Sequence, residues 1–378
     1  MKLAVLGCGS IGSVVAKFLS EDFRGADIVV LDKFTDSCKN RLSRLGTNSV
    51  CVDYVDAGDL SALASRLKGY DLVIDSLPGY LGFNAMLASI KACVDLVSIS
   101  YMPQDPMELS EEAANADITI VPDAGLAPGL SNVLAGRILS ILRDVDEIGI
   151  YVGGLPKENI SPLGYVITWS AVDLLEEYVR PARVIIDGGV RYIDPLSSTE
   201  KVHIEGLGEF EGFYSDGLRT LLHTLKGKVR RAYEVTLRYP GHLSKIRILK
   251  ELGFLDDEKI ALDNASVSPK EFTAKVLERK LRKEGIKDLV ILKVVGKNKL
   301  GSRIEYSLVE EGSEHTYAMA RTTAAPAVAT ALLVAEGELS KGVIPPEYIG
   351  MNTELFSKFM NYLNKKQIKI KMNFEERT

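Results

Sequence analysis

The strongest constraint on the fold of this chain is a glycine-rich turn near its amino terminus. Lys2–Leu6 is a short apolar run that predicts a buried strand, and Gly7-Cys8-Gly9-Ser10-Ile11-Gly12 follows it directly. Residues 13–19 then have apolar positions at helical spacing, and a second apolar run, 28–31, ends in Asp32. This order of strand, glycine turn, helix, strand and acid predicts a βαβ unit that binds a dinucleotide.

Each glycine of the turn has its own task in such a unit. Gly7 permits the tight turn, Gly9 lets the backbone approach a pyrophosphate, and Gly12 lets the helix pack closely on the strand. Ser10 and Ile11 stand where the helix is expected to begin, near Ile11, with free N–H groups that attract phosphates. The alternative is a glycine-rich turn in some other kind of α/β protein.

The acid at the end of the second strand bears on which dinucleotide binds. Asp32 lies twenty residues after Gly12, where a carboxylate can accept hydrogen bonds from the adenosine ribose hydroxyls. A 2′-phosphate would meet this carboxylate at close range, which favours NAD over NADP. Lys33 could partly neutralise the clash, so NADP stays an alternative.

Composition and charge argue against several classes of function. A chain of 378 residues is long for one hydrophobic core, so two domains are expected. The net charge is −5 and no basic face is visible, which argues against nucleic acid as a partner. Met1 leads directly into the first strand, leaving no room for a signal peptide. No uninterrupted apolar stretch reaches the roughly 20 residues of a membrane span, so no membrane association is expected.

The cysteines indicate a compartment rather than a metal site. Cys8, Cys38, Cys51 and Cys93 are scattered and form no C-x-x-C pair. This scatter argues against a zinc ribbon or a disulfide framework and favours a reducing cytoplasm. No metal site is expected.

Strands alternate with helices as far as residue 121, which predicts an α/β domain with a doubly wound parallel sheet. Ligands on such sheets bind beyond the carboxyl ends of the strands, so the residues after each apolar run are informative. Asp53 can accept a hydrogen bond from the adenine amino group or merely cap the next turn. The residues expected near the nicotinamide ribose are Ser76, Leu77 and Pro78.

The pattern changes after residue 122. Strand-like and loop-like stretches dominate from 145 to about 310, which suggests an α+β domain with an open, mostly antiparallel sheet. Residues 322–336 are apolar and alanine-rich, and they predict a buried helix with Pro326 in its first turn. The tail, 361–378, is expected to form a surface strand or an arm.

Two kinds of chemical group stand out in loop-like settings. Arg219 and Arg238 could each bind a substrate carboxylate with two hydrogen bonds, although both could instead form surface ion pairs. Oxidation of an amine also requires a base, because the nitrogen must lose a proton as hydride leaves. The candidates for this base are Asp123, Tyr101, His223 and His242.

A set of motifs runs through nearly the whole chain. They are G-C-G-S-I-G at 7–12, D-A-G-L-A-P-G-L-S-N at 123–132, Y-V-G-G-L-P at 151–156, P-L-G-Y at 162–165, T-W-S at 168–170, E-G-F-Y-S-D-G-L-R-T-L at 211–221, Y-P-G-H at 239–242, and R-T-T at 321–323 before the apolar helix. In this order they resemble the saccharopine dehydrogenase superfamily, most closely its lysine 6-dehydrogenase branch.

The resemblance implies a discontinuous first domain. Residues 1–125 and 320–378 would form an NAD-binding Rossmann domain, and residues 126–319 a substrate-binding and dimerisation domain with an open mixed or antiparallel sheet. It also implies catalysis in the cleft and a homodimer through the second-domain sheet.

The implied substrate is a small amino acid. Ala127 replaces the second acid of the saccharopine enzymes' loop, Ser131 and Asn132 replace a D-H pair, and Val152 replaces a cysteine. Saccharopine's glutamyl arm needs added polar contacts, so the changes favour L-lysine. Saccharopine oxidation or reduction, or a related imine reductase, is the alternative, and a non-enzymatic NAD-binding protein is least expected.

The resemblance also suggests a role for each candidate residue. Arg219 would hold the lysine carboxylate, with the aliphatic chain along Trp169 and Tyr214. The ε-carbon would give hydride to NAD, with Asp123 or Tyr101 aiding proton loss, and hydrolysis of the imine would release ammonia. The remaining site candidates are His223 as a catalytic group and Ser170 and Arg238 as substrate-binding groups. Trp169 could instead be a core residue, and His223 could simply face a polar rim.

Overall fold

The computed structural model describes residues 1–378 except 48, 264, 284, 314–315 and 378. The predicted ranges 361–378 and 320–378 therefore end outside the described residues. The chain forms two compact units. Unit 1 contains Met1–Asp144, Arg219–Thr224 and Ala320–Lys371, and unit 2 contains Val145–Leu218, Leu225–Met319 and Met372–Thr378.

Unit 1 is built on a parallel sheet of seven strands in the order β17-β6-β5-β4-β1-β2-β3. From β1 the chain adds β2 and β3 on one side of the sheet and then β4, β5 and β6 on the other. This change of side at β1 is typical of a doubly wound dinucleotide-binding fold. Its strands are β1 Lys2–Leu6, β2 Asp27–Asp32, β3 Cys51–Tyr54, β4 Leu72–Asp75, β5 Asp95–Ser98, β6 Thr119–Val121 and β17 Gly342–Val343. The last of these extends the sheet with residues from near the carboxyl end of the chain.

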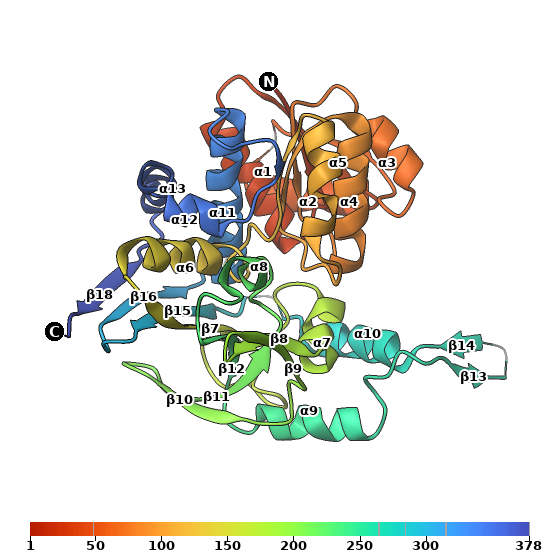
Figure 1. Ribbon diagram of the computed structural model, residues 1–378. Coiled ribbons are helices and arrows are strands. Elements are labelled where there is room, and N and C mark those ends of the chain that lie inside the picture. The colour runs from red at the N-terminus through yellow and green to blue at the C-terminus, as the bar shows by residue number, and fades with distance from the viewer. Residues whose placement is uncertain (48, 264, 284, 314–315, 378) are drawn as a thin grey trace. The chain divides into compact units, whose positions relative to one another are not determined.

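Helices connect and cover these strands. They are α1 Ser10–Asp22, α2 Thr35–Arg44, α3 Leu60–Leu67, α4 Gly79–Ala92, the 3₁₀ helix η1 Pro106–Leu109, α5 Ser110–Asn115, α6 Leu130–Ile141, α8 Leu221–Leu225, α11 Ala318–Ala335, α12 Glu347–Met351 and α13 Thr353–Lys365. One side of the sheet is covered by α3, α4 and α5 (Figure 1), whose apolar residues Leu63, Met86 and Ala113 pack in one cluster with Leu6 and Val73. The predicted parallel α/β sheet is confirmed.

Unit 2 has a mixed sheet of nine strands. Its main path runs β10-β11-β12-β7-β15-β16-β18, and β8 and β9 join it beside β12. Only β12 and β7 pair in parallel among the register pairs described for this sheet. The strands are β7 Val145–Pro156, β8 Ala182–Ile186, β9 Gly189–Ile193, β10 Glu200–Ile204, β11 Gly208–Ser215, β12 Arg231–Arg238, β15 Asp288–Asn298, β16 Arg303–Glu311 and β18 Lys371–Glu375.

Three helices cover part of this sheet: α7 Ala171–Val179, α9 His242–Glu251 and α10 Pro269–Leu281. Leu175, Ile246 and Leu281 from these helices pack with Leu237 and Ile291 from the sheet. A hairpin of β13 Ile260–Leu262 and β14 Ala265–Val267 projects beyond α10 (Figure 1). The expected second domain of α+β type with an open mixed sheet is confirmed.

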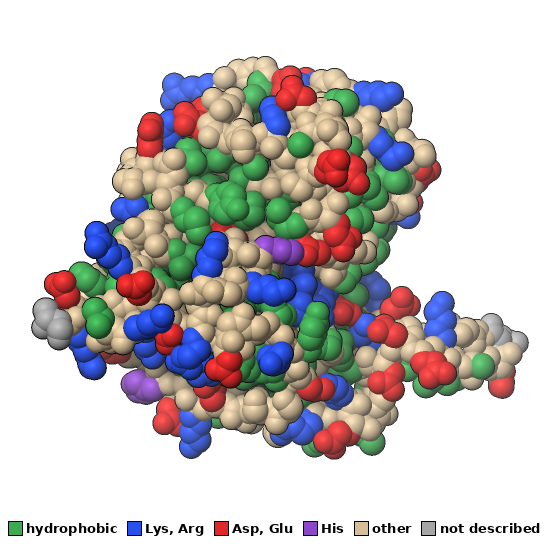
Figure 2. All heavy atoms as spheres, viewed as in Figure 1, with side chains coloured by type: hydrophobic (Ala, Val, Ile, Leu, Met, Phe, Trp, Pro, Cys, Tyr) green, Lys and Arg blue, Asp and Glu red, His purple; other side chains and the backbone are tan. Residues whose placement is uncertain are grey.

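A cavity of about 470 Å³ is lined by residues from strands of this sheet, among them β7, β10, β12, β15 and β16. Figure 2 shows Lys and Arg side chains gathered over the strands of this unit, and the cavity lining includes Lys293, Lys297 and Arg303 with the acids Glu147 and Glu200. Such a surface of both signs can be self-complementary. Dimerisation through this sheet stays a prediction.

One expectation about the apolar helix needs correction. Pro326 lies in the middle of α11 rather than in its first turn, because the helix begins four residues earlier than predicted, at Ala318. By length and composition alone α11 could cross a membrane. However, 78% of its apolar window is buried within the protein, as in the core helix of a globular fold.

Close packing of α6 against α12 depends on a glycine. A Cβ atom at Gly136 would lie 2.0 Å from the carbonyl oxygen of Glu347, a distance at which one helix must move. Alanine normally stabilises a helix interior by about 1 kcal/mol relative to glycine, so any loss here must come from packing.

We therefore expect Gly136→Ala to lower the free energy of unfolding by about 1–3 kcal/mol, as overpacked cores do. Urea denaturation measures this change. Gly189→Ala is the control, because a Cβ there meets nothing nearer than 3.7 Å. A Gly136→Ala protein as stable as the parent would show that α12 is not held closely against α6.

Candidate functional site

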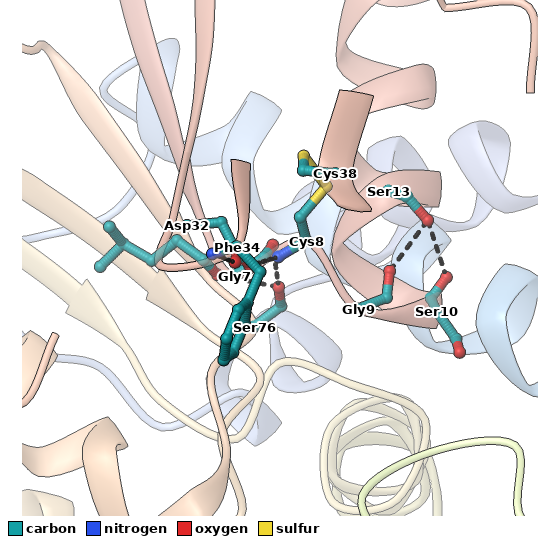
Figure 3. Close-up of a disulfide and its surroundings, with 10 residues drawn as sticks. Gly7, Cys8, Gly9, Ser10, Ser13, Asp32, Phe34, Cys38 and Ser76 are labelled. Atoms are coloured by element: carbon teal, nitrogen blue, oxygen red, sulfur yellow. Dashed lines mark hydrogen bonds between the residues drawn. A yellow bond between two sulfur atoms is a disulfide. The ribbon is translucent and has the colours of Figure 1, made fainter. Parts of the chain in front are cut away.

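The glycine turn is held by backbone and side-chain hydrogen bonds. Gly7 has φ of +86° and its N–H donates to Leu31 O at 2.9 Å, which joins the turn to β2. The hydroxyl of Ser76, at the end of β4, lies 2.9 Å from Leu6 O and 3.1 Å from Gly7 O. A Cβ at Gly12 would lie 2.1 Å from Gly7 O, so only glycine lets α1 approach so closely. The helix begins at Ser10, one residue before the predicted start (Figure 3).

The turn fits a dinucleotide pyrophosphate. A Cβ placed at Gly9 would meet no atom within 4 Å, so the space beside this residue is open. Gly9 caps α1, and no side chain in the described part of the chain forms a capping hydrogen bond there. Free N–H groups at the start of a 13-residue helix thus face an open cradle, which is the arrangement that binds phosphate.

Asp32 supports the turn as well as standing at the ribose position. Its Oδ2 accepts a hydrogen bond from Cys8 N–H and its Oδ1 one from Phe34 N–H, each at 2.6 Å. The neighbouring Lys33 forms an ion pair with Asp56 rather than with Asp32, since its Nζ lies 2.7 Å from Asp56 Oδ2. This hydrogen bond raises the pKa of Lys33, and the pair lies on the exposed surface.

Asp53 forms an ion pair within the unit. Its carboxylate is paired with the guanidinium of Arg66, and Oδ1 also accepts from Tyr54 N–H at 2.8 Å. The cap of the following helix α3 is Asp59 rather than Asp53. A contact between Asp53 and adenine stays a prediction.

A buried carboxyl lies beneath the predicted nicotinamide-ribose loop. Asp75 ends β4, is fully buried, and accepts hydrogen bonds from the hydroxyls of Ser98 and Ser100, both at 2.7 Å. Leu77 N–H also donates to it at 2.9 Å. Burial raises the pKa of Asp75 to about 6 despite these hydrogen bonds. The loop of Ser76, Leu77 and Pro78 is therefore anchored on this carboxyl.

One cysteine expectation was wrong. Cys8, inside the glycine turn, forms a disulfide with Cys38 of α2 (Figure 3). The two residues are 30 positions apart in sequence, and only the fold brings their Cα atoms to 5.4 Å. Spacing arguments look for local pairs such as C-x-x-C and therefore miss this bridge.

Asp123 and Arg219 form a fully buried ion pair in unit 1. Arg219 Nε donates to the two carboxylate oxygens at 3.1 and 3.3 Å, and both side chains have 0% exposure. Nη2 of Arg219 donates to Gln104 O at 3.2 Å. Within the described residues Nη1 of Arg219 has no hydrogen-bond partner. Hydrogen bonds from a guanidinium to a carboxylate are among the strongest in proteins.

Tyr101 and His223 lie in the same unit as this pair. The Arg219 guanidinium carbon is 5.9 Å from the centre of the Tyr101 ring. His223 Nε2 is 2.6 Å from Asp105 Oδ2, and about half of the His223 side chain is exposed. A carboxylate that orients an imidazole in this way is a common arrangement around a general base.

The segment that carries Arg219 is fastened to unit 1 by a second buried carboxyl. Glu347 accepts hydrogen bonds from the hydroxyls of Thr220 at 2.7 Å and Thr224 at 2.6 Å. Asn132 Nδ2 donates to Thr220 at 3.2 Å and so joins the cluster to the loop after Asp123. Burial raises the pKa of Glu347, while the hydrogen bonds oppose that change.

Arg238, the other carboxylate candidate, belongs to the core of unit 2. It donates to Tyr178 Oη at 2.9 Å and to Leu237 O at 3.0 Å, and it pairs with Glu177. His242 is buried beside it, with Nδ1 2.8 Å from Leu163 O and Nε2 2.8 Å from Tyr178 Oη. Burial and the nearby Arg238 lower the pKa of His242 to about 3. His242 is thus neutral in this core.

The remaining predicted substrate residues are also in unit 2. Trp169 Nε1 donates to Tyr165 Oη at 3.1 Å, and the ring packs at the edge of the hydrophobic core. Ser170 caps α7 by accepting from Asp173 N–H. Tyr214 on β11 accepts a hydrogen bond from Arg231 at 2.9 Å. Their roles in binding substrate stay predictions.

Sequence reasoning missed the two buried carboxyls and Asp105. Asp75 directly follows the apolar run 72–74, where an acid at a strand end is a usable signal. Glu347 and Asp105 have no such signal, because their partners lie more than a hundred residues away in sequence. Among the described residues no group of three His, Cys, Asp or Glu side chains could hold a metal ion.

Two family models match consecutive parts of the chain. Residues 3–121 match the saccharopine dehydrogenase NADP binding domain, and residues 125–368 match the saccharopine dehydrogenase C-terminal domain. The apo saccharopine dehydrogenase (L-Glu forming) of Saccharomyces cerevisiae has a similar fold, with a TM-score of 0.79 and 20% sequence identity. That match covers 99% of this chain and 100% of the yeast chain.

The curated relatives are often longer than this chain. The mouse mitochondrial alpha-aminoadipic semialdehyde synthase is 26% identical over 79% of this chain and 34% of its own length. The saccharopine dehydrogenase [NADP(+), L-glutamate-forming] of Pyricularia oryzae is 26% identical over 72% of this chain and 62% of its own. A carboxyaminopropylagmatine dehydrogenase of Synechocystis is 23% identical over 73% and 72% respectively. The chain spans about a third of the length of the first of these relatives.

The buried carboxyl of Asp75 makes stability depend on pH. Its pKa is about 6 in the folded protein and 3.8 in an exposed chain, so the unfolded chain loses this proton first as pH rises. Folding stability from this group is therefore full below pH 4 and lost through pH 6, a change of about 3 kcal/mol.

Asparagine cannot ionise, so we expect the Asp75→Asn protein not to lose this part of its folding stability as pH rises. Its free energy of unfolding relative to the parent should rise by about 2 kcal/mol between pH 4 and pH 7, measured by urea denaturation at each pH. A difference that does not change with pH would show that Asp75 stays ionised in the fold.

Proposed function

The chain belongs to the saccharopine dehydrogenase family, and on that premise we propose that it is a nicotinamide-dependent oxidoreductase acting on the amine of an amino acid. The substrate we propose is L-lysine, oxidised at its ε-carbon with release of ammonia. Saccharopine is the second candidate, because a relative of this chain is a saccharopine dehydrogenase. The two differ in size and in the number of carboxylates to be held.

The buried Asp123–Arg219 pair carries the proposal. An isolated ion pair in a protein interior is costly unless its polar atoms are satisfied, and Nη1 of Arg219 has no partner among the described residues. A substrate carboxylate would satisfy this nitrogen. Asp123 accepts from Nε and thereby fixes the plane of the guanidinium, so it acts as a positioning residue for Arg219.

The residues around the glycine turn favour NAD as the cofactor. The open cradle at Gly9 fits a pyrophosphate, and Asp32 stands where it can accept from a ribose hydroxyl. Lys33 pairs with Asp56 rather than with Asp32, so a 2′-phosphate would meet the Asp32 carboxylate at close range. The bound dinucleotide supplies the hydride acceptor.

His223 is the base that we favour for the proton of the amine. Its Nε2–H donates to Asp105, which leaves the Nδ1 lone pair as the acceptor. The ε-carbon loses hydride, its bond to nitrogen becomes a double bond, and the nitrogen loses one proton to His223. Water then adds to the imine carbon and ammonia leaves, so lysine, water and oxidised NAD give the semialdehyde, ammonium and reduced NAD.

Four positions of the loop and strand support lysine over saccharopine. Ala127 and Val152 offer no polar atom to a second carboxylate, and both are partly exposed. Ser131 and Asn132 are fully buried and hydrogen-bonded to each other at 3.0 Å. None of these four side chains provides the additional cation that saccharopine's extra carboxylates call for.

The substrate panel tests the proposal directly. Purified protein is given NAD with L-lysine, saccharopine, ornithine or carboxynorspermidine, and reduced cofactor and ammonia are both measured. Reduced cofactor and ammonia in equal amounts from lysine alone are expected. Reduced cofactor from saccharopine without ammonia would instead support saccharopine as the substrate. No reduced cofactor with any of the four amines would contradict both proposed substrates.

The role of Arg219 is tested by Arg219→Lys, which keeps the positive charge but loses the planar fork that holds a carboxylate. We expect KM for the amino acid to rise at least about tenfold, since roughly 1.4 kcal/mol or more of binding is lost, with NAD affinity unchanged. The control is Arg230→Lys, because Arg230 forms an exposed ion pair with Asp146 in unit 2. An unchanged KM would remove Arg219 from substrate binding.

Asp32 determines the choice of cofactor in this account. We expect Asp32→Ala to bind NAD more weakly, by roughly tenfold for a lost charged hydrogen bond, and to narrow the preference over NADP. The ratio of the two dissociation constants, measured by titration calorimetry, gives the answer. A ratio equal to that of the parent would exclude Asp32 from the ribose contact.

A further inference from the structure

The disulfide between Cys8 and Cys38 lies within the cofactor-binding elements themselves. Cys8 is the second residue of the glycine turn, and Cys38 is the fourth residue of α2, directly after the strand that ends in Asp32. Both side chains are almost fully buried. The bridge thus joins the turn expected to hold the pyrophosphate to the helix beside the expected ribose position (Figure 3).

Asp32 links the same two segments as the disulfide, through hydrogen bonds. It accepts from the N–H of Cys8 on one oxygen and from the N–H of Phe34 on the other. The covalent path Cys8–Cys38 and the hydrogen-bonded path through Asp32 therefore fix the same two segments. The position of the Asp32 carboxylate depends on both paths.

We propose that the Cys8–Cys38 disulfide is a reversible redox latch that sets the affinity of the chain for its dinucleotide. The disulfide form binds tightly and the dithiol form binds weakly. Two thiol sulfur atoms cannot remain at bonding distance, and both lie in a packed interior, so reduction requires the turn or α2 to move. Movement of either segment disturbs Asp32, and affinity falls as preorganisation is lost. The inference rests on the proposed cofactor but not on the proposed substrate.

The chemistry of the latch is thiol–disulfide exchange. A thiolate of a small dithiol attacks one sulfur of the bridge and forms a mixed disulfide, and the second thiol of the reagent then displaces the remaining cysteine. Two electrons and two protons pass to Cys8 and Cys38, and the dithiol becomes a cyclic disulfide. Oxidation by a small-molecule disulfide reverses the exchange.

Reciprocity provides a second readout. If the disulfide form binds the dinucleotide tenfold more tightly, the dinucleotide must make the disulfide tenfold harder to reduce. For a two-electron couple this factor corresponds to a shift of about 30 mV in midpoint potential. A bridge that merely stabilises the fold would not respond to the cofactor.

The experiment compares the full chain before and after treatment with dithiothreitol. Thiol titration should count two cysteines before reduction and four after it, because Cys51 and Cys93 are free and exposed. Calorimetric titration with NAD and with ADP-ribose should give a dissociation constant about tenfold higher after reduction. A redox titration with mixtures of reduced and oxidised dithiothreitol should show the 30 mV shift when NAD is present.

Matched variants separate the latch from other effects of the reductant. Cys38→Ser should bind NAD weakly whatever the redox state, and the Cys51→Ser, Cys93→Ser double variant should switch as the parent does. If Cys38→Ser does not fold, the NAD affinity of the reduced parent serves as the measurement without the disulfide.

The possible outcomes are distinct. Equal affinity in both redox states, or tighter binding after reduction, would overturn the latch alone. No dinucleotide binding in either state would overturn the latch together with the proposed cofactor. Redox-dependent binding without turnover of lysine would support the latch and reject only the substrate.

Discussion

The buried ion pair between Asp123 and Arg219 is the interaction on which the candidate site depends. It joins a residue directly after the last strand of the early alternating pattern to a residue almost a hundred positions later. Charges with 0% side-chain exposure require compensation, and the structure supplies it from the Arg219 Nε hydrogen bonds and the Gln104 carbonyl. The segment Arg219–Thr224 thereby belongs to unit 1, although its neighbours on either side belong to unit 2.

Glu347 extends this constraint to the end of the chain. Its carboxyl holds Thr220 and Thr224, and its helix α12 lies against α6, where Gly136 allows the backbones to meet. The loop after β6, the segment of Arg219 and a helix beyond residue 340 are thus fixed together. A site assembled from three distant parts of a chain can be shaped by substitutions in any of them.

The sequence indicated the local features of this site well and its long-range contacts poorly. The glycine turn, the strand ends and Asp32 follow from patterns over short distances, and the parallel sheet confirms the predicted α/β fold. The Cys8–Cys38 bridge, the Asp105–His223 contact and the commitment of Arg238 to Glu177 were not predicted. Each depends on which side chains the tertiary fold brings together, and residue type alone made Arg219 and Arg238 equal candidates. The predicted position of Pro326 was wrong for a local reason, because a uniformly apolar sequence does not indicate where its helix begins.

The central claim is that this chain removes hydride from the carbon that carries the side-chain amine of lysine. L-Lysine with both ε-hydrogens replaced by deuterium tests it most directly, with mass spectrometry of the reduced cofactor as the readout. One deuterium in each molecule of reduced cofactor, and none when the label is at the α-carbon, is the predicted result. Transfer from the α-carbon, or reduced cofactor without any label, would contradict the account.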